Sequence, residues 1–472
     1  MVRCRPFPDT RKFYQKRTMP MRYAPPIALL LALATTAAWA NPHERLLANG
    51  LRVIVREDHR APTVAHMVWY RAGSMDETSG RTGVAHVLEH MMFKGTPTAG
   101  PGEFNRRVAA AGGRDNAFTS RDYTAYFQQV PKQKLPEMMQ LEADRMRHLS
   151  LDEKEFAQEI KVVMEERRLR TDDQPQALLY EKLNAVAFQV HPYRVPIIGW
   201  MTDLQNMTVT DARAWYEDWY APNNAYVVVV GDVDHQEVFR LAEQHYGALP
   251  ARTLPVRKPQ DEPSQAGTRR LTVKAPADLP VVMMAYKVPV IRNVEQDVDP
   301  YALEMLAAVL AGHDAARLTR HLVREQRLAV SAGASYDSTA RGPGIFHLHG
   351  APTVGRSRAE LEAGLRAELV RVQEQGVSAE ELARAKAQLI ASQIYKLDSI
   401  FAQAMEIGQL EAAGIPHTMN RRIIDKLQEV SSEQVQAVAR KYFSDEALTV
   451  AELDPQPLPQ TPRPRSPFVP RH

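Results

Sequence analysis

The hydrophobic and polar positions of the chain follow two patterns. A short apolar run at residues 64–70 predicts a strand, whereas apolar positions three to four residues apart over residues 152–170 predict a long helix. Both patterns return about 220 residues later, as a strand-like run at 281–286 and a helical pattern at 379–396. The repeated order at a nearly constant offset indicates a duplicated unit.

Each unit begins with strands, continues through helices and closes on a helix followed by a strand. This order predicts an α+β fold of two homologous domains, each a largely antiparallel sheet with helices packed on one face. Proline and polar residues without periodicity separate the units and predict a linker at residues 251–268. We therefore expect an N-terminal domain at residues 41–250 and a C-terminal domain at residues 269–453.

The two ends of the chain do not fit either unit. Residues 1–40 combine a basic start, an apolar run at 27–39 and Ala-Trp-Ala before Asn41, which is typical of a cleaved signal peptide. An uncleaved anchor is the alternative, but the run is too short to span a bilayer, and we expect no integral membrane segment after cleavage. Export in this way predicts a periplasmic protein. Residues 454–472 are rich in proline and predict a disordered tail.

Removing the signal peptide changes the charge of the protein. The whole chain has a net charge of +3, but the leader holds seven basic residues and one acidic residue, so 52 basic and 55 acidic residues remain, a net charge of −3. The excess of basic residues thus lies in the targeting segment, and we expect no nucleic-acid partner for the mature protein. Cys4, the only cysteine, lies in the leader, so the mature chain has no thiol for a disulfide.

Residues 86–90 read His-Val-Leu-Glu-His and carry the first candidate chemistry. On a helix, His86, Glu89 and His90 fall within roughly one 100° arc and face one point. Imidazole nitrogens are good zinc ligands, and the adjacent carboxylate is placed to take a proton from a water held at the metal. A surface helix with incidental histidines is the alternative interpretation.

A second candidate element lies in the helical pattern at residues 152–170. Glu159 and Glu166 are seven residues apart and therefore share a helix face. Glu166 would complete a His-His-Glu ligand set and leave a fourth position open for water. Glu159 is placed to orient a histidine ring without binding the metal itself. A solvated acidic helix face is the alternative.

The combination of His86-x-x-Glu89-His90 with Glu166, 76 residues after His90, resembles the inverted zinc motif of the pitrilysin/insulinase family, the inverzincins. Segments at residues 112–124, 193–199 and 220–232 support the resemblance, which is closest to the shorter, processing-peptidase-like bacterial members. It implies two domains facing across a cleft and one zinc ion per chain in the N-terminal domain. The implied ligands are His86, His90 and Glu166, with Glu89 as the general base.

The resemblance also implies how substrate binds. The family presents a peptide to an exposed edge strand, expected here within residues 116–126, where Asn116 and Ala117 would touch the substrate. An ordinary interior strand is the alternative. The resulting hypothesis is a zinc endopeptidase acting on short or unfolded peptides. Two alternatives stay open, namely a non-catalytic substrate-binding or scaffold subunit, and a zinc protein that cleaves another bond or stores the metal.

The second unit bears on the number of metal sites and on partners. Its counterpart of the zinc helix, residues 301–312, contains no pair of histidines, so one metal site per chain is expected. Larger relatives use an Arg and a Tyr to bind the developing oxyanion, but Arg341 has no Tyr at the matching distance. We therefore expect a heterodimer with a homologous subunit that lacks the zinc motif. A homodimer in which His347 or Tyr336 substitutes is the alternative.

Overall fold

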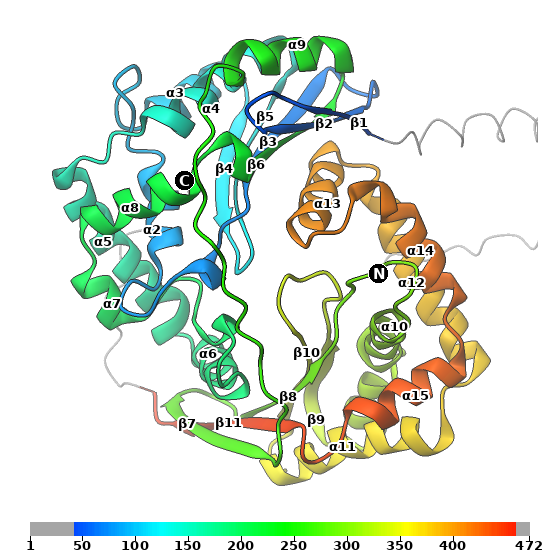
Figure 1. Cartoon of the computed structure of the whole chain (residues 1–472). Helices are drawn as coiled ribbons and strands as arrows, with labels where there is room; N and C mark the ends of the chain where they lie inside the picture. Colours follow the sequence, from blue (N-terminus) through cyan, green and yellow to red (C-terminus); the bar gives the residue numbers. More distant parts are fainter. Residues whose placement is uncertain (1–41, 459–472) are drawn as a thin grey trace, which may run out of the picture. The chain divides into compact units, whose positions relative to one another are not determined.

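A computed structural model describes residues 42–458 of the chain (Figure 1). The expected signal peptide at residues 1–40 and residues 459–472 of the expected tail lie outside the described residues. Within residues 42–458, none of the helices combines the length and the apolar character that crossing a bilayer requires. The described chain forms two sheets, one in each half of the sequence, with helices packed around them.

The first half of the sequence forms a six-stranded sheet in the order β1-β2-β6-β3-β5-β4, and the second half a five-stranded sheet in the order β7-β11-β8-β10-β9. The first sheet comprises β1 (His43–Leu46), β2 (Arg52–Glu57), β3 (Thr63–Tyr70), β4 (Arg114–Thr119), β5 (Thr124–Pro131) and β6 (Ala225–Gly231). The second sheet comprises β7 (Arg269–Pro276), β8 (Val281–Val288), β9 (Ala329–Ser335), β10 (Gly344–Pro352) and β11 (Leu448–Gln456).

The two sheets repeat one arrangement, apart from the additional edge strand β1. The order β2-β6-β3-β5-β4 corresponds strand by strand to β7-β11-β8-β10-β9. In each sheet, the strand of the repeat that comes first in the sequence pairs in parallel with the strand that comes last, β2 with β6 and β7 with β11. The other strand pairs among residues 42–458 are antiparallel. The predicted α+β fold of two homologous, largely antiparallel units is therefore confirmed, and one parallel pair makes each sheet mixed.

Two expected boundaries differ from the structure. Residues 116–126, expected as one edge strand, form the hairpin of β4 and β5, because the polar residues from Ser120 to Asp122 make a turn and only β4 reaches the edge of the sheet. Asp454, Pro455 and Gln456, which the sequence assigned to the tail, instead continue β11 and pair with β7.

Most helices of each half pack on one face of the sheet of the same half, through a large apolar core. The first half contains η2 (Ser74–Asp76), α2 (Val84–Met91), α3 (Glu103–Ala110), η3 (Lys132–Lys134), α4 (Leu135–His148), α5 (Glu153–Arg167), η4 (Arg168–Asp172), η5 (Pro192–Arg194), α7 (Met201–Asn206), α8 (Val209–Trp219), η6 (Pro222–Asn224) and α9 (His235–Tyr246). The second half contains α10 (Asp299–Ala311), η7 (Leu318–Glu325), α11 (Arg358–Gln375), α12 (Ala379–Lys396), η8 (His417–Met419), α14 (Asn420–Glu429) and α15 (Ser432–Tyr442).

Each half also lends one helix to the sheet of the other half (Figure 1). Helix α13 (Ile400–Ala412), from the second half, packs on the first sheet, where Ala404 and Ile407 share a core with Trp69. Helix α6 (Pro175–Ala187), from the first half, packs on the second sheet through Leu179 and Leu183. Both sheets are thus covered on two faces, where the sequence predicted helices on one face only.

Gly408 allows α13 to approach the first sheet closely. The Tyr226 hydroxyl donates to the Gly408 carbonyl oxygen at 2.7 Å, and a Cβ on Gly408 would lie 2.1 Å from two ring carbons of Trp69. Alanine favours a helix over glycine by about 1 kcal/mol, but this overlap is far larger than a side chain can absorb. We expect Gly408→Ala to lower the free energy of unfolding by about 1–3 kcal/mol in denaturant titration.

Gly100 supplies the control for this prediction. A Cβ on Gly100 would have no heavy atom within 4 Å, so Gly100→Ala should leave the free energy of unfolding nearly unchanged. Equal midpoints for the two variants would show that the contact between α13 and the first sheet does not contribute to stability.

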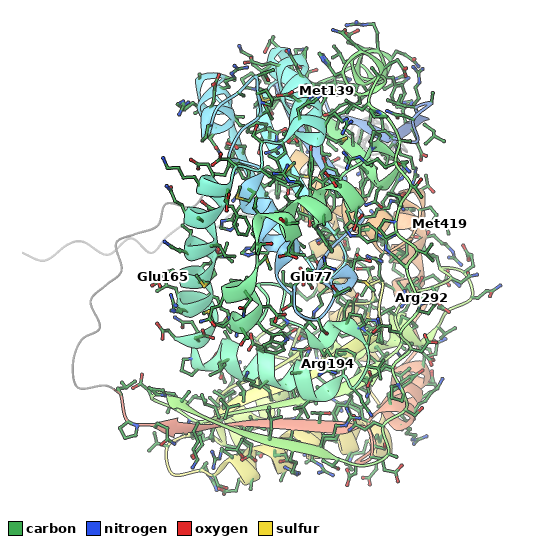
Figure 2. All side chains as sticks on the ribbon, turned by 60° about the vertical axis from the view of Figure 1, so that its left-hand side comes forward. Glu77, Met139, Glu165, Arg194, Arg292 and Met419 are labelled. Atoms are coloured by element: carbon green, nitrogen blue, oxygen red, sulfur yellow. The ribbon has the colours of Figure 1, made fainter. Side chains whose placement is uncertain are left out.

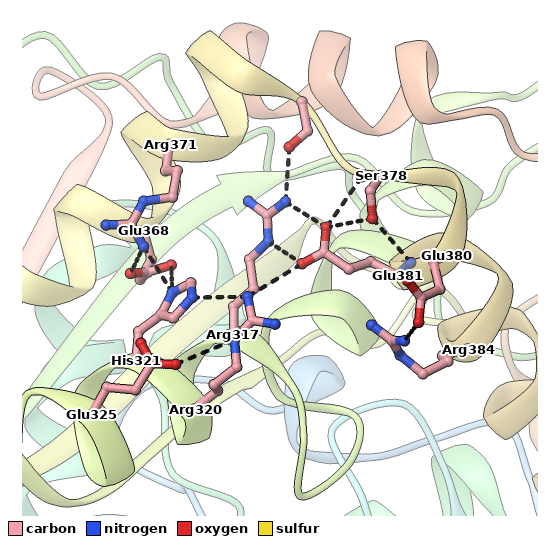
Figure 3. Close-up of polar contacts among 11 residues, drawn as sticks. Arg317, Arg320, His321, Glu325, Glu368, Arg371, Ser378, Glu380, Glu381 and Arg384 are labelled. Carbon is pink, nitrogen blue, oxygen red and sulfur yellow. Dashed lines mark hydrogen bonds and ion pairs between the residues drawn. The ribbon is translucent and has the colours of Figure 1, made fainter.

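A network of ion pairs holds η7, a π-helix, against α11 and α12 (Figure 3). The guanidinium of the buried Arg317 makes two hydrogen bonds to the Glu381 carboxylate, at 2.9 and 2.8 Å. His321 Nδ1 lies 2.8 Å from Glu368 Oε2. Four arginines and four glutamates balance in this cluster, namely Arg317, Arg320, Arg371, Arg384, Glu325, Glu368, Glu380 and Glu381. The cluster therefore has the character of a structural network rather than of a site for a charged ligand.

Candidate functional site

Helix α2 is short and begins abruptly. Gly83 adopts a φ of 89° before the first turn, and a Cβ there would lie 2.5 Å from the Ile198 carbonyl oxygen, so only glycine fits. Val84, Val87 and Leu88 are buried in the core and fix the rotation of the helix. That rotation turns His86 and His90 toward Glu166 of α5, and Glu89 toward Thr119 at the end of β4.

Glu77 anchors the start of α2. Its carboxylate accepts the N–H groups of Gly83 at 2.8 Å and Ala85 at 2.9 Å, which satisfies backbone donors at the helix N-terminus (Glu77 is labelled in Figure 2). Burial raises the pKa of Glu77 well above its ordinary value, against the lowering effect of these two hydrogen bonds. No sequence pattern identifies this residue, because a lone glutamate six residues before Gly83 does not form a helix-cap motif.

The structure brings His86 and His90 of α2 together with Glu166 of α5. His90 Nε2 lies 3.3 Å and His86 Nε2 lies 3.8 Å from the same oxygen, Oε2 of Glu166. One donor atom from each residue lies within 4.8 Å of the other two. A tetrahedral zinc ion with bonds of about 2.0–2.1 Å separates its ligand atoms by about 3.3 Å, so the three groups fit such an ion with small adjustments.

Glu159, two turns before Glu166, contacts the other nitrogen of His90. Its Oε1 lies 2.9 Å from His90 Nδ1, and its second oxygen pairs with Lys94. This contact leaves His90 Nε2 facing Glu166. A carboxylate on the far nitrogen of a histidine is the usual partner of a metal-binding imidazole.

The protonation of the cluster follows from burial and from mutual hydrogen bonds. Burial lowers the pKa of His86 to about 3, and His90 adds to this effect. Burial also lowers the pKa of His90, but its bonds to Glu159 and Glu166 outweigh that effect and raise the pKa to about 9. Burial raises the pKa of Glu166, but the hydrogen bond from His90 and the nearby positive charges outweigh burial and lower the pKa to about 2. A cation binding here would therefore meet an ionised carboxylate and displace one proton from His90.

His86 has an unusual environment for a buried imidazole. Its Nδ1 is buried without a hydrogen-bond partner among the described residues, and its Nε2 approaches only Glu166, at 3.8 Å. Buried polar atoms are ordinarily paired. A metal bond at Nε2 would give this nitrogen the close partner that Glu166, at 3.8 Å, does not provide, while Nδ1 would stay unpaired. The environment of Nε2 therefore fits a zinc ligand.

Glu89 lies beside the cluster and faces the edge of the first sheet. Its Oε2 accepts a hydrogen bond of 2.5 Å from the hydroxyl of Thr119, the last residue of β4. Burial raises the pKa of Glu89, while the Thr119 bond opposes the rise. Thr119 belongs to no sequence motif, because only the fold brings the end of β4 to α2.

The chain is similar to known proteins over most of its length. The model of the insulinase family, peptidase family M16, matches residues 52–200, and the model of the M16 inactive domain matches residues 206–389. The zinc protease PqqE of Helicobacter pylori is 33% identical over 427 residues, covering 88% of this chain and 93% of that protein. The chain belongs to the insulinase family of M16 peptidases.

Further relatives agree with this assignment. An uncharacterized zinc protease of Bacillus subtilis, YmxG, is 27% identical and covers 84% of this chain and 95% of that protein. The crystal structure of a protease from Helicobacter pylori superposes with a TM-score of 0.83 at 31% identity, covering 88% of this chain and all of that chain. The expected inverzincin family and enzyme class are confirmed, and the second half corresponds to the inactive domain of M16 peptidases.

The edge strand of this M16 peptidase lies next to the cluster. β4 is the last strand of the sheet and pairs only with β5 among the strands of residues 42–458. Asn116 is partly exposed on β4, whereas the side chain of Ala117 is buried. The Asn116 carbonyl oxygen Oδ1 accepts the N–H of Ala117 at 2.9 Å. A peptide pairing with this N–H would first have to displace the Asn116 side chain.

The oxyanion candidates from the second half of this M16 peptidase are already engaged. Both terminal nitrogens of Arg341 pair with Asp76, at 2.9 and 3.1 Å, and one also donates to the Asp122 carbonyl oxygen at 3.0 Å. The Tyr336 hydroxyl donates to the Pro289 carbonyl oxygen at 2.5 Å. Burial lowers the pKa of His347 to about 3, so its imidazole is neutral at pH 7. Arg341, the arginine that lacks a Tyr at the matching distance, is thus held by Asp76 and Asp122.

A cavity of 650 Å³ lies between the two halves. The turn after β4 lines it with Arg121 and Tyr123, α6 with Tyr180, and β10 with His347. Ser120, the residue after the end of β4, also lines the cavity, whereas His86, His90 and Glu166 do not.

Proposed function

We propose that this M16 peptidase is a zinc endopeptidase that hydrolyses short or unfolded peptides, with one catalytic zinc ion per chain. His86, His90 and Glu166 hold the ion in this proposal, and Glu89 is the general base. The observation that carries it is the approach of two imidazole nitrogens to one partly buried carboxylate oxygen, at 3.3 and 3.8 Å, with a second glutamate beside them. This donor set leaves a fourth position open, as catalytic zinc sites require.

The proposed mechanism assigns each protein group one task. When bound, zinc polarises the scissile carbonyl and makes a water molecule acidic enough to attack at neutral pH. Glu89 takes the proton of that water and then delivers it to the nitrogen of the leaving amine, which breaks the peptide bond. The hydroxyl of Thr119 holds one oxygen of Glu89, and burial makes the carboxylate a stronger base than an exposed glutamate.

The substrate in this proposal is a peptide in extended form. The free edge of β4 offers main-chain hydrogen bonds to an added strand, and such bonds do not depend on sequence. A folded protein cannot present an unpaired strand to this edge, so the substrate must be short or unfolded. Asn116 and Ala117 are the proposed contacts, because both lie on β4 a few residues before Thr119.

Metal removal tests the proposal directly. Treatment with a strong chelator should abolish cleavage of an unfolded polypeptide, and restoring zinc should recover it, with mass spectrometry locating internal cleavage sites. Chelated protein that cleaves at the untreated rate would rule out the zinc mechanism. Peptide binding without cleavage under any metal condition would favour the alternative function, a substrate-binding or scaffold subunit.

Glu159 offers a second test, because its proposed role is to position His90. Glu159→Gln should weaken zinc binding about 10–100-fold while the protein stays folded, since the amide no longer holds His90 as a carboxylate does. Competition against a zinc-binding dye measures the affinity. Glu153→Gln, at an exposed position in the first turn of α5, is the matched control and should bind zinc like the parent. Equal affinities for both variants would contradict the positioning role.

The remaining assignments are also proposals. The N-terminal domain at residues 41–250 would carry the catalytic zinc, and the domain at 269–453 would be its homologue without a catalytic metal. Residues 250–266 have no helix or strand, which supports a linker there. Export through the leader would place the enzyme in the periplasm. Because Arg341 is engaged by Asp76, our proposed source of the oxyanion-binding groups is a homologous second subunit without the zinc motif, in a heterodimer. A homodimer in which His347 or Tyr336 substitutes is the alternative.

A further inference from the structure

A second group of histidines surrounds one carboxylate on the first sheet, well apart in sequence from the catalytic motif. We call it the Glu57 cluster, and it consists of His43 at the start of β1, Glu57 at the end of β2, His59 in the turn after β2, and His235 at the start of α9. One donor atom from each of His43, Glu57 and His235 lies within 4.8 Å of the other two. The proposed ligands of the catalytic zinc, His86, His90 and Glu166, form the other such group among residues 42–458.

The distances show how closely the Glu57 cluster is gathered. His235 Nδ1 lies 2.8 Å from Glu57 Oε1, and the rings of His43 and His235 stack with centroids 3.6 Å apart. His59 Nε2 lies 3.6 Å from the second oxygen of Glu57. Three imidazoles from three separate elements therefore meet one carboxylate.

His59 also has the partner that metal-binding histidines usually have. Its Nδ1 lies 2.7 Å from Asp232 Oδ1, and Lys132 holds the other oxygen of Asp232 at 2.6 Å. The aspartate thus directs the opposite nitrogen of His59, Nε2, toward Glu57. The same arrangement joins His90 to Glu159 in the catalytic cluster, and such carboxylates orient imidazole ligands in metal sites generally.

We propose that the Glu57 cluster is a second metal site, which binds a zinc ion through His43, His235 and Glu57 with His59 as the fourth ligand. A set of imidazole nitrogens with one carboxylate binds zinc in preference to calcium or magnesium, which favour oxygen ligands. The site is open to solvent, since His43 is exposed and the others are partly or fully accessible, so an ion can enter without unfolding. Binding would replace the contact of His235 Nδ1 with Glu57, or that of its Nε2 with Gln236, by a bond to the ion.

The site would fasten the first strand of the described chain. All four residues of β1 are exposed, and β1 pairs only with β2 among the strands of residues 42–458. Edge strands held by so few contacts open easily. A zinc ion shared by β1, β2 and α9 would join this strand to two buried elements, so zinc should protect the N-terminal end against proteolysis.

Protonated histidines paired with Glu57 and Asp232 are the competing explanation, and metal counting separates the two. The full chain is produced without a histidine tag, stripped with chelator and titrated with Zn²⁺. We expect two equivalents for the parent and one for the double variant His43→Ala with His235→Ala. Peptidase activity should be the same in both, because the cluster is separate from the catalytic residues.

A matched control removes two histidines elsewhere. The double variant His148→Ala with His313→Ala should still bind two equivalents. Limited proteolysis near residue 43 should slow several-fold with zinc in the parent and in this control, but not in the His43/His235 variant. Cobalt substitution offers a further readout, since loss of one tetrahedral site should remove about half of the visible absorption.

Two results would overturn the proposal. One is a stoichiometry that does not change on replacing His43 and His235, and the other is a second equivalent that binds only at millimolar zinc. The outcome does not depend on the catalytic assignment. If the proposed catalytic site binds no zinc, the parent should still hold one equivalent that disappears in the His43/His235 variant.

Discussion

Glu89→Gln should reduce peptide cleavage by about 10³-fold or more while the zinc content stays unchanged. Glutamine has the shape of glutamate and can keep the contact with the Thr119 hydroxyl, so the local structure should persist. The amide cannot accept a proton from water at neutral pH, and this lost proton transfer is the reason for the expected effect. Cleavage of a fluorogenic peptide, together with metal analysis of the same sample, measures both quantities.

Glu165→Gln is the matched control for this experiment. Glu165 lies on the outer side of α5, where its side chain is 41% exposed and pairs with Arg168 (Figure 2). This variant should cleave at the parental rate. If Glu89→Gln cleaves as fast as Glu165→Gln, Glu89 is not the general base. If it loses its zinc as well, the residue acts on the metal site rather than on the proton.

Glu166→Gln should remove the catalytic zinc and, with it, nearly all activity. Glu166 is the only anionic member of the three proposed ligands, and its oxygen is the atom that both imidazoles approach. A neutral amide binds zinc much more weakly than a carboxylate, so we expect at least about a 100-fold loss of affinity, beyond that expected from Glu159→Gln. Isothermal titration of stripped protein with zinc measures this loss.

The neighbouring Glu165→Gln again serves as control, because it makes the same chemical change one residue away, at an exposed position of the same helix. It should retain the parental zinc affinity and activity. A Glu166→Gln protein that binds zinc and cleaves peptide like Glu165→Gln would exclude Glu166 as a ligand. Circular dichroism of both variants excludes unfolding as the cause, since Glu166 also pairs with Arg170.

Some parts of this fold and site follow from sequence patterns, because the relevant geometry lies within one element. The facing of His86, Glu89 and His90 toward one point follows from helix periodicity alone. The duplicated order of strands and helices likewise predicts two similar sheets, as the structure has them. Glu166 lies on a different helix, so ligand chemistry made it a candidate partner of the histidines and the resemblance to a known family supported it, but no local pattern placed it beside them.

Other features depend on contacts between elements far apart in sequence, which no local pattern records. The Thr119 hydroxyl reaches Glu89 because β4 ends beside α2, 30 residues along the chain. Arg341 pairs with Asp76, 265 residues away in the sequence, and the spacing of motifs could not predict this ion pair. The hairpin turn after Thr119 was missed because apolar positions on both sides of it continue the alternation of a strand.

The exchange of α6 and α13 limits how this protein can be divided. Cutting the chain between residues 246 and 269 would give two fragments, and each would keep a sheet whose covering helix belongs to the other fragment. Alone, each fragment would expose an apolar surface that includes Trp69 in one case and Ala451 and Leu453 in the other. Mixed together, the two fragments have the complementary surfaces needed to reassemble into one enzyme.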